Sequence, residues 1–366
     1  MNKLKSMNAT TRSNIITYAM VVAAFVIMQS LLAAHAVSSS LTGLLVPICT
    51  YICMAISLNL VVGISGELSL GHAGFMSVGA FVGVVSASML AGAITVPWIR
   101  LLVSMAIGGV FAAVAGFLVG VPVMRLHGDY LAIVTLAFGE IIKNLLNNLY
   151  VGFDVRGLHV SMRGTQALGM EGGKVVINGP QGAVGITKLS NFVIGFVLVM
   201  FTLFVVLNLI NSRTGRAIMA VRDNRIAAES VGINTTKYRL IAFVVSAALA
   251  GMAGALYAQN FSSIVPKKFD FNTSILVLVF VVLGGMGNIR GCIISATLLT
   301  VLPEMLRGIG DFRMLIYAIV LISVMLITNN RAIQTRLDDI KRGFRRRGDD
   351  KAALEAEARE GGAVDE

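Results

Sequence analysis

Charged residues are scarce in this sequence. Lysine, arginine, aspartate and glutamate make up 13% of the 366 residues, against about 25% in soluble domains. Hydrophobic residues make up 56%. This composition excludes an ordinary soluble domain, whose surface needs far more charge, and it is typical of a protein embedded in a lipid bilayer.

Cysteine is also rare. Cys49, Cys53 and Cys292 all lie in apolar segments, and no spacing of metal ligands surrounds them. A thiol in such a segment behaves as a small hydrophobic group. We therefore expect neither a disulfide framework nor a zinc site, and no cofactor.

A nucleotide-binding motif is missing as well. GMEGGKVV contains Gly-Gly-Lys, but it lacks the spacing of a phosphate loop and the serine or threonine after its lysine. GGMGNIRG lacks the third glycine of a dinucleotide fingerprint at the right place. We expect no enzyme, and if the chain belongs to a pump, the energy comes from another chain.

What the sequence does contain is a series of apolar runs along nearly its whole length. Runs of about 20 residues can cross the roughly 30 Å of hydrocarbon in a bilayer as helices. We predict an all-α, polytopic transmembrane bundle of about ten spans. They lie near residues 15–34, 43–62, 73–93, 98–121, 130–150, 190–211, 238–258, 273–289, 292–308 and 312–329.

Basic residues indicate how these spans are oriented. Lysine and arginine collect on the cytoplasmic side of membrane proteins. With ten spans, the basic clusters in residues 1–14, 212–237 and 331–366 all fall on one side. The net charge of +11 is then a topological signal rather than a sign of nucleic-acid binding. We expect an inner (plasma) membrane protein with both termini in the cytoplasm.

The predicted domains follow from this topology. Residues 1–14 form a cytoplasmic N-terminus and residues 15–330 a transmembrane domain. The first apolar run is expected to be an uncleaved span, and signal-peptide cleavage between about Ala33 and Ser39 is the alternative. Residues 331–366 switch from basic to acidic and predict a solvated cytoplasmic tail that is partly helical or disordered.

The longest polar stretch between spans is residues 151–189, which the topology places outside. It is rich in glycine, and the alternating piece KVVI stands directly before the turn residues NGP. This pattern predicts a small β-hairpin on the outer face.

A polar island, NSRTGRAIMAVRDNRIAAESVG, separates two apolar runs. It predicts two short helices, Arg216–Arg222 and Arg225–Val231, with Gly232 in the left-handed position that ends a helix. Asn234 is expected to cap the next span. Two short helices at the membrane surface form a compact knob that suits a groove on a partner protein. The alternative is a basic loop that serves topology alone.

The segment GISGELSLGHAGF carries polar side chains and four glycines between two apolar runs. Glu67, Ser69 and His72 are candidates for a translocation pathway, because polar groups at membrane depth are tolerated chiefly inside a bundle or cavity. The alternative is a tight cytoplasmic turn, in which the glycines allow close helix packing and Ser69 caps the next helix. His72 by itself is better explained as a packing residue than as a proton relay.

A second polar set lies on the predicted span at residues 130–150. Glu140 and Lys143 are three residues apart, and Asn144 continues the same face. Such a face should point toward protein or water, so Glu140 and Asn144 are candidates for a wall of the pathway. Pairing with a neighbouring membrane subunit is the alternative.

Three long blocks of the sequence resemble one family. SRTGRAIMAVRDNRIAAESVGINTTKYRLIAFVVSAALAGMAGALYA closely resembles the coupling-loop region of LivM-type branched-chain amino acid permeases of the ATP-binding cassette (ABC) class. VVGISGELSLGHAGFMSVGA and RLHGDYLAIVTLAFGEIIKNLLNN are similar to the same family, as are NGPQGAVGI and FVVLGGMGNIRG. The resemblance covers most of residues 40–330. The outer segment before Asn178 is longer than is usual in this family.

The resemblance implies a permease subunit of an ABC importer for branched-chain amino acids. Its partners would be a homologous LivH-type permease in a heterodimer, two cytoplasmic ATP-binding subunits, an external substrate-binding protein and the lipid bilayer. The island would then form the coupling helices that fit the ATPase groove, with Glu229 as a polar contact. The candidate coupling residues are Arg213, Gly215, Arg216, Arg222, Ala227, Ala228, Glu229 and Gly232.

Other functions stay open at this point. A related permease for urea or short amides would have the same architecture. A self-sufficient secondary carrier or channel could use the intramembrane glutamate and histidine residues. A membrane scaffold or sensor would work through its cytoplasmic tail.

Overall fold

The computed structural model describes residues 9–34, 38–126, 128–154, 157–170 and 173–329. The predicted tail at 331–366 lies outside the described residues, as do Lys3 and Lys5 of the predicted cytoplasmic N-terminus. The chain forms two compact units, residues 1–305 and 306–366. In the second unit, a 3₁₀-helical stretch at Leu306–Phe312 leads into helix α12 (Arg313–Asn329).

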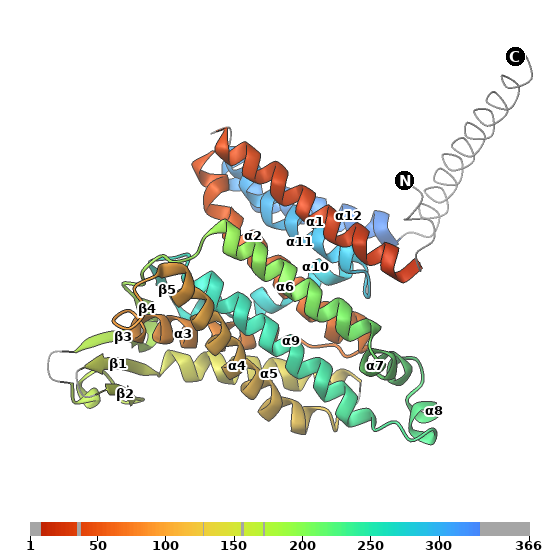
Figure 1. The fold of residues 1–366 in the computed structure, drawn as a ribbon, viewed down its shortest axis with the longest axis horizontal. Coiled ribbons are helices and arrows are strands. Elements are labelled where there is room, and N and C mark those ends of the chain that lie inside the picture. The colour runs from red at the N-terminus through yellow and green to blue at the C-terminus, as the bar shows by residue number, and fades with distance from the viewer. Residues whose placement is uncertain (1–8, 35–37, 127, 155–156, 171–172, 330–366) are drawn as a thin grey trace, which may run out of the picture. The chain divides into compact units, whose positions relative to one another are not determined.

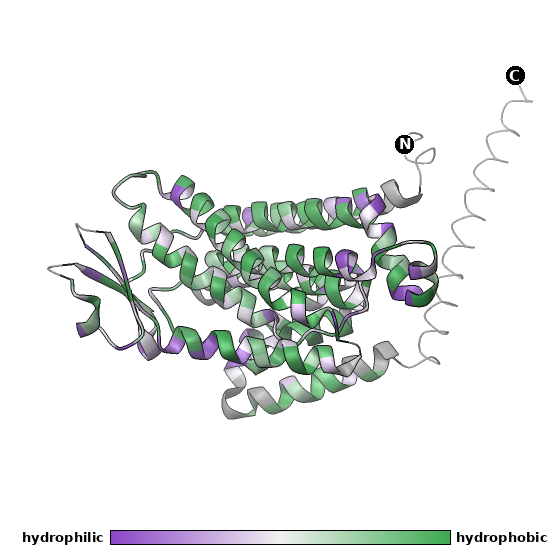
Figure 2. Cartoon of the chain, turned by 90° about the horizontal axis from the view of Figure 1, so that it is seen from below, coloured by the Kyte–Doolittle hydropathy of each residue, from purple (hydrophilic) through white to green (hydrophobic). Residues whose placement is uncertain are grey.

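Helices dominate the first unit, which confirms the predicted all-α polytopic class (Figure 1). Their long apolar sequences are the reason, and Figure 2 shows hydrophobic residues along most of their length. The long helices are α1 (Ala9–Ala33), α2 (Ser39–Asn59), α3 (His72–Met89), α4 (Pro97–Val123), α5 (Asp129–Asn147), α6 (Phe192–Asn211), α9 (Thr235–Ala258), α10 (Phe271–Gly284) and α11 (Ile289–Met305).

Eight helices in the described part of the chain are long and apolar enough to cross a membrane, so the predicted number of about ten is not confirmed. The other two predicted spans fall on α10 and α12, which have 14 and 17 residues. The predicted span 273–289 is wrong at its end. Helix α10 stops at Gly284 because Gly285 and Gly287 take positive φ angles of 87° and 84°.

The predicted outer hairpin is confirmed as part of a larger element. A five-stranded antiparallel sheet has the order β2-β1-β3-β4-β5. Its strands are β1 (Tyr150–Asp154), β2 (Gly157–Ser161), β3 (Lys174–Asn178), β4 (Ala183–Val184) and β5 (Ser263–Ile264). The predicted KVVI piece lies in β3. Strand β5 was not predicted, because two residues carry no periodic signal.

Two further short helices, α7 (Arg213–Asp223) and α8 (Arg225–Ser230), lie in the polar island. Figures 1 and 2 both show the sheet at one end of the helical bundle and α7 with α8 at the other end. Their placement on opposite sides of a membrane stays a prediction.

Helices α3 and α9 pack closely together, because glycine allows them to touch backbone to backbone. A β-carbon added to Gly79 in α3 would lie 2.0 Å from the carbonyl oxygen of Gly251 in α9. One added to Gly254 would lie 2.0 Å from the carbonyl oxygen of Met76. Small residues of this kind are the usual means of close helix packing in membranes.

Candidate functional site

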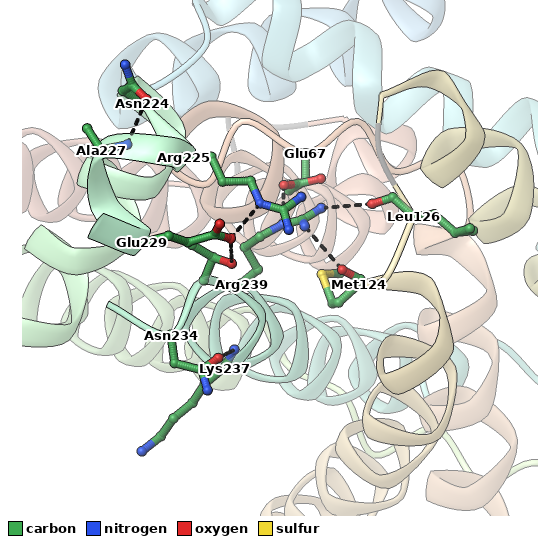
Figure 3. A network of polar contacts seen from close by, with 11 residues as sticks. Glu67, Met124, Leu126, Asn224, Arg225, Ala227, Glu229, Asn234, Lys237 and Arg239 are labelled. Carbon is green, nitrogen blue, oxygen red and sulfur yellow. Dashed lines mark hydrogen bonds and ion pairs between the residues drawn. The ribbon is translucent and has the colours of Figure 1, made fainter. Parts of the chain in front are cut away.

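The polar island folds as its sequence predicts. Helix α7 starts three residues earlier than expected, where the Ser212 side chain accepts a hydrogen bond from the Gly215 amide at 3.1 Å. Asn224 caps α8 and Asn234 caps α9, each through its side-chain oxygen at 3.0 Å (Figure 3). Gly232 has a φ of 84°. The predicted cap at Asn234 and the left-handed Gly232 are both confirmed.

The eight candidate coupling residues do not all face outward. Exposed positions on the island are Arg213, Arg216, Arg222, Ala227, Glu229 and Gly232. Ala228 is buried, and a β-carbon on Gly215 would lie 2.2 Å from the carbonyl oxygen of Leu209. Gly215 and Ala228 therefore pack against the chain itself, and of the two alanines expected to allow close approach of a partner, only Ala227 is on the surface.

Glu229 is held within the island rather than pointing freely away from it. Its Oε1 accepts hydrogen bonds from Arg225 Nε and from Thr235 Oγ1, both at 2.9 Å (Figure 3). Arg225 lies one turn earlier in α8, and Thr235 is the first residue of α9. Glu229 thus fixes α8 onto the start of α9, a structural role that the sequence did not indicate.

Two large apolar side chains are exposed on this polar surface. Ile226 is 81% exposed and Val231 is 75% exposed. Exposed apolar groups rimmed by polar residues mark protein interaction sites. Ile226 follows Arg225 and Val231 follows Ser230 in the sequence, and this placement beside polar residues was the signal that could have identified them.

Beside the island, helix α2 does not end in an ordinary turn. Its last part is a π-helical turn at Leu60–Ile64, and all five residues are buried. Arg222 of α7 reaches this turn, because its Nη1 donates a hydrogen bond to the Gly63 carbonyl oxygen at 3.0 Å. The same guanidinium also donates to Asp223 Oδ1.

Glu67, a predicted pathway residue, lies just past this turn in an ion pair with Arg239 of α9 (Figure 3). The side chains are 16% and 4% exposed, respectively. Arg239 also donates to the carbonyl oxygens of Met124 at 3.2 Å and Leu126 at 3.5 Å, at the end of α4. The ion pair joins three parts of the chain at the same end of the bundle as the island.

Ser69 and His72 are both buried. The possibility that Ser69 caps the next helix is wrong: Gly71 stands at that position, and among the described residues no hydrogen-bond partner reaches the Ser69 hydroxyl. His72 Nε2 lies 2.9 Å from Ser57 Oγ, which agrees with a packing role. The glycines do allow close packing, since a β-carbon on Gly71 would lie 2.0 Å from the Thr135 carbonyl oxygen of α5.

Glu140 and Asn144 lie on α5. Glu140 forms the expected ion pair with Lys143, and Asn144 is exposed. Helix α5 lies against the start of α3, where a β-carbon on Gly74 would lie 3.0 Å from the Gly139 Cα. The two sets of predicted pathway residues therefore lie on α5 and on the start of α3 with the connection before it, and their role in translocation stays a prediction.

The positive φ of Gly232, in the turn after α8, predicts how the two short helices of the island respond to a substitution there. No other group lies within 4 Å of a β-carbon at Gly232, so only the backbone conformation restricts this position. Gly232→Val is expected to distort the turn between α8 and α9 and to lower the thermal unfolding midpoint of the chain, because a β-branched residue is strongly disfavoured at positive φ. Gly232→Asn, which tolerates this conformation, is the matched control. Equal unfolding midpoints of the two variants would contradict the expectation.

Comparison with known proteins agrees with this architecture. Residues 40–328 match the family model described as "Branched-chain amino acid transport system / permease component". The permease protein LivM of Escherichia coli (strain K12) is 36% identical over 292 residues, which are 75% of this chain and 66% of LivM. The chain thus matches slightly less than two thirds of that relative's length.

A second group of relatives is more distant. LivH of Escherichia coli (strain K12) is 26% identical over 252 residues, covering 68% of this chain and 79% of LivH. BraD of Pseudomonas aeruginosa is 27% identical over 276 residues, covering 69% and 80%. No solved structure matches the chain. The family match covers the helical bundle, the π-helical turn and the polar island together, and the chain therefore belongs to the family of permease components of branched-chain amino acid transport systems.

Proposed function

We propose that the chain is the membrane permease subunit of an ABC importer for branched-chain amino acids. It forms one half of a heterodimer with a LivH-type permease in the inner membrane, with its N- and C-termini in the cytoplasm. Two separate ATP-binding subunits supply the energy, and an external binding protein supplies the solute. The support comes from the family membership, the membrane-spanning helices and the form of the polar island.

The observation that carries this proposal is the knob formed by α7 and α8. Three capping side chains and the bond network of Glu229 hold its two short helices in place. Ile226 and Val231 are exposed on the island, which also carries exposed Arg213 and Arg216. An apolar pair on a knob with exposed cations fits a groove with an apolar floor and an acidic rim on the ATPase subunit.

The opposite end of the bundle suits the external partner. The five-stranded sheet lies there, and β2 is its edge strand. Leu158 and Val160 on β2 are 48% and 58% exposed. With the ATPase subunits at α7 and α8, the binding protein delivers its solute on the side of the sheet. Glu140 and Asn144 on α5 are proposed to line the route or to contact the second permease.

Substitution of Ile226 by glutamate tests the proposed docking. The chain should insert normally, because Ile226 is 81% exposed and contributes little to its own packing. Co-purification of the ATPase subunits should fall by about tenfold or more, since a buried apolar anchor typically supplies 1–2 kcal/mol or more to an interface. The amounts of ATPase subunit recovered per permease measure the effect.

Val160→Glu is the matched control, because it places the same charge on an exposed position of β2. It should leave ATPase recovery unchanged. Full ATPase recovery with Ile226→Glu would contradict the assignment of the knob. Uptake by the isolated chain in vesicles, driven by an ion gradient without ATP, would instead identify a secondary carrier.

A further inference from the structure

The π-helical turn at Leu60–Ile64 is an unusual element in the bundle. The Ser65 amide donates to the Leu60 carbonyl oxygen at 3.1 Å, and the Glu67 amide donates to that of Val61 at 3.0 Å. Such widened turns are rare and occur mostly at functional sites. Beyond it, residues 65–71 form an irregular connection that runs to α3. The backbone from Leu60 to Gly71 can thus change its conformation without the unfolding of a regular α-helix.

The first contact between the island and this segment is made by Arg222. The Gly63 carbonyl belongs to the last turn of the helix, where carbonyl groups lack partners within the helix itself. Arg222 supplies the missing donor at 3.0 Å from a position 159 residues away in the sequence. Its aliphatic stem fills the space beside Gly66, where an added β-carbon would lie 2.6 Å from Arg222 Cγ. Gly66 has a φ of 75°, so a glycine there makes this approach possible.

The second connection passes through α9. Glu67 is paired with Arg239, which lies in the second turn of that helix. The first turn of α9 is tied to α8 because Thr235 donates to Glu229. The segment is therefore connected to the island on both sides of Gly66, by Arg222 from α7 and by Arg239 from α9.

On its other side, the segment contacts the membrane helices directly. The Leu70 amide donates to Thr135 Oγ1 of α5 at 3.1 Å. Directly before the segment, Asn59 at the end of α2 accepts a hydrogen bond from the Gly287 amide through Oδ1 at 2.8 Å. A β-carbon on Gly63 would lie 2.2 Å from the Gly287 amide nitrogen. Because these contacts are direct, a shift of the segment is expected to displace α5 and the turn between α10 and α11 as well.

We propose that Leu60–Gly71 is the element that transmits movement of α7 and α8 into the membrane helices, with Arg222 as the positioning residue that links them. This inference rests on the proposed function, since it needs an ATPase that moves the knob. It assigns the Arg222 side chain, which is 38% exposed, to a contact within the permease that transmits movement, rather than to the surface that docks the ATPase.

Arg222→Gln in the complete transporter tests the assignment. Glutamine is too short to reach the Gly63 carbonyl, so the complex should assemble and hydrolyse ATP while solute uptake per ATP falls about tenfold, the size of one charge-assisted hydrogen bond. Arg290→Gln is the matched control. Arg290 also bonds a distant element, with Nε donating to Thr17 Oγ1 at 2.8 Å, and uptake per ATP should be retained.

A disulfide in place of the Arg222 contact distinguishes a role in transmission from a simple loss of structure. A β-carbon on Gly66 would lie 3.6 Å from Arg222 Cβ, within the range that a disulfide spans. The double variant Gly66→Cys with Arg222→Cys should be uncoupled when reduced. Oxidation should restore uptake per ATP, whereas the two single variants should not respond. The three native cysteines are buried, which limits competing disulfides.

The outcomes distinguish the inference from the proposed function. Unchanged uptake per ATP in Arg222→Gln overturns the transmission role. Loss of ATPase binding in Arg222→Gln also overturns it, because Arg222 would then be a docking residue, while the importer assignment would stand. Absence of any ATPase in the wild-type complex would overturn both.

Discussion

Replacement of Arg239 by methionine is expected to lower the free energy of unfolding by about 3–5 kcal/mol, the usual cost of removing one partner from a buried ion pair. Arg239 is 4% exposed, and its loss leaves the Glu67 carboxylate without its cation. It also leaves the Met124 and Leu126 carbonyl groups without this donor. The loss of monodisperse protein on heating in detergent measures the effect.

A double substitution makes this prediction specific. Adding Glu67→Leu to Arg239→Met removes the uncompensated charge, so part of the lost stability should return, because well-packed apolar residues can replace a buried ion pair. The carbonyl groups at the end of α4 would still lack their donor, so recovery should be incomplete. Equal stability of Arg239→Met and the wild type would contradict the structural role of the pair.

Gly254→Val is expected to have a similarly large effect, about 3 kcal/mol or more. A β-carbon at this position would lie 2.0 Å from the Met76 carbonyl oxygen and 3.1 Å from the Ala80 amide nitrogen. Both obstacles are backbone atoms of α3, so no side-chain rotation can relieve the clash and α3 must separate from α9. The thermal unfolding midpoint of the purified chain should fall well below that of the wild type.

Gly43→Val provides the comparison for this effect. Gly43 lies near the start of α2, and nothing comes within 4 Å of a β-carbon there. The substitution should leave the midpoint close to the wild-type value, because valine is no worse than glycine in a helix interior. If the two variants unfold alike, backbone contact between α3 and α9 is not what holds the bundle together.

The sequence predicted the features that depend on neighbouring residues. Apolar run length gives most of the spans, strand alternation gives β3, and capping chemistry gives the two helices of the island with Asn234 and Gly232. Each of these follows from an interaction within a few residues, so periodicity and capping preferences are sufficient to find it.

The features that the sequence did not predict depend on distant contacts. The π-helical turn is bonded at Gly63 by Arg222, which is 159 residues away in the sequence. Glu67 could be identified as polar at membrane depth, but its partner Arg239 belongs to another helix. The sequence assigned Ala228 and Glu229 to a partner surface. It could not show that Ala228 is buried or that Glu229 accepts a hydrogen bond from Thr235 of α9, because both features are set by tertiary structure.

Cross-linking from position 226 in the assembled complex tests the central claim most directly. A photoreactive amino acid in place of Ile226 should form its main adduct with an ATP-binding subunit, because this exposed side chain is proposed to enter the ATPase groove. The same substitution at Val160 should give no such adduct. Absence of that adduct from position 226, together with labelling of Ile226→Cys by a membrane-impermeant thiol reagent added outside intact cells, would contradict the proposed function.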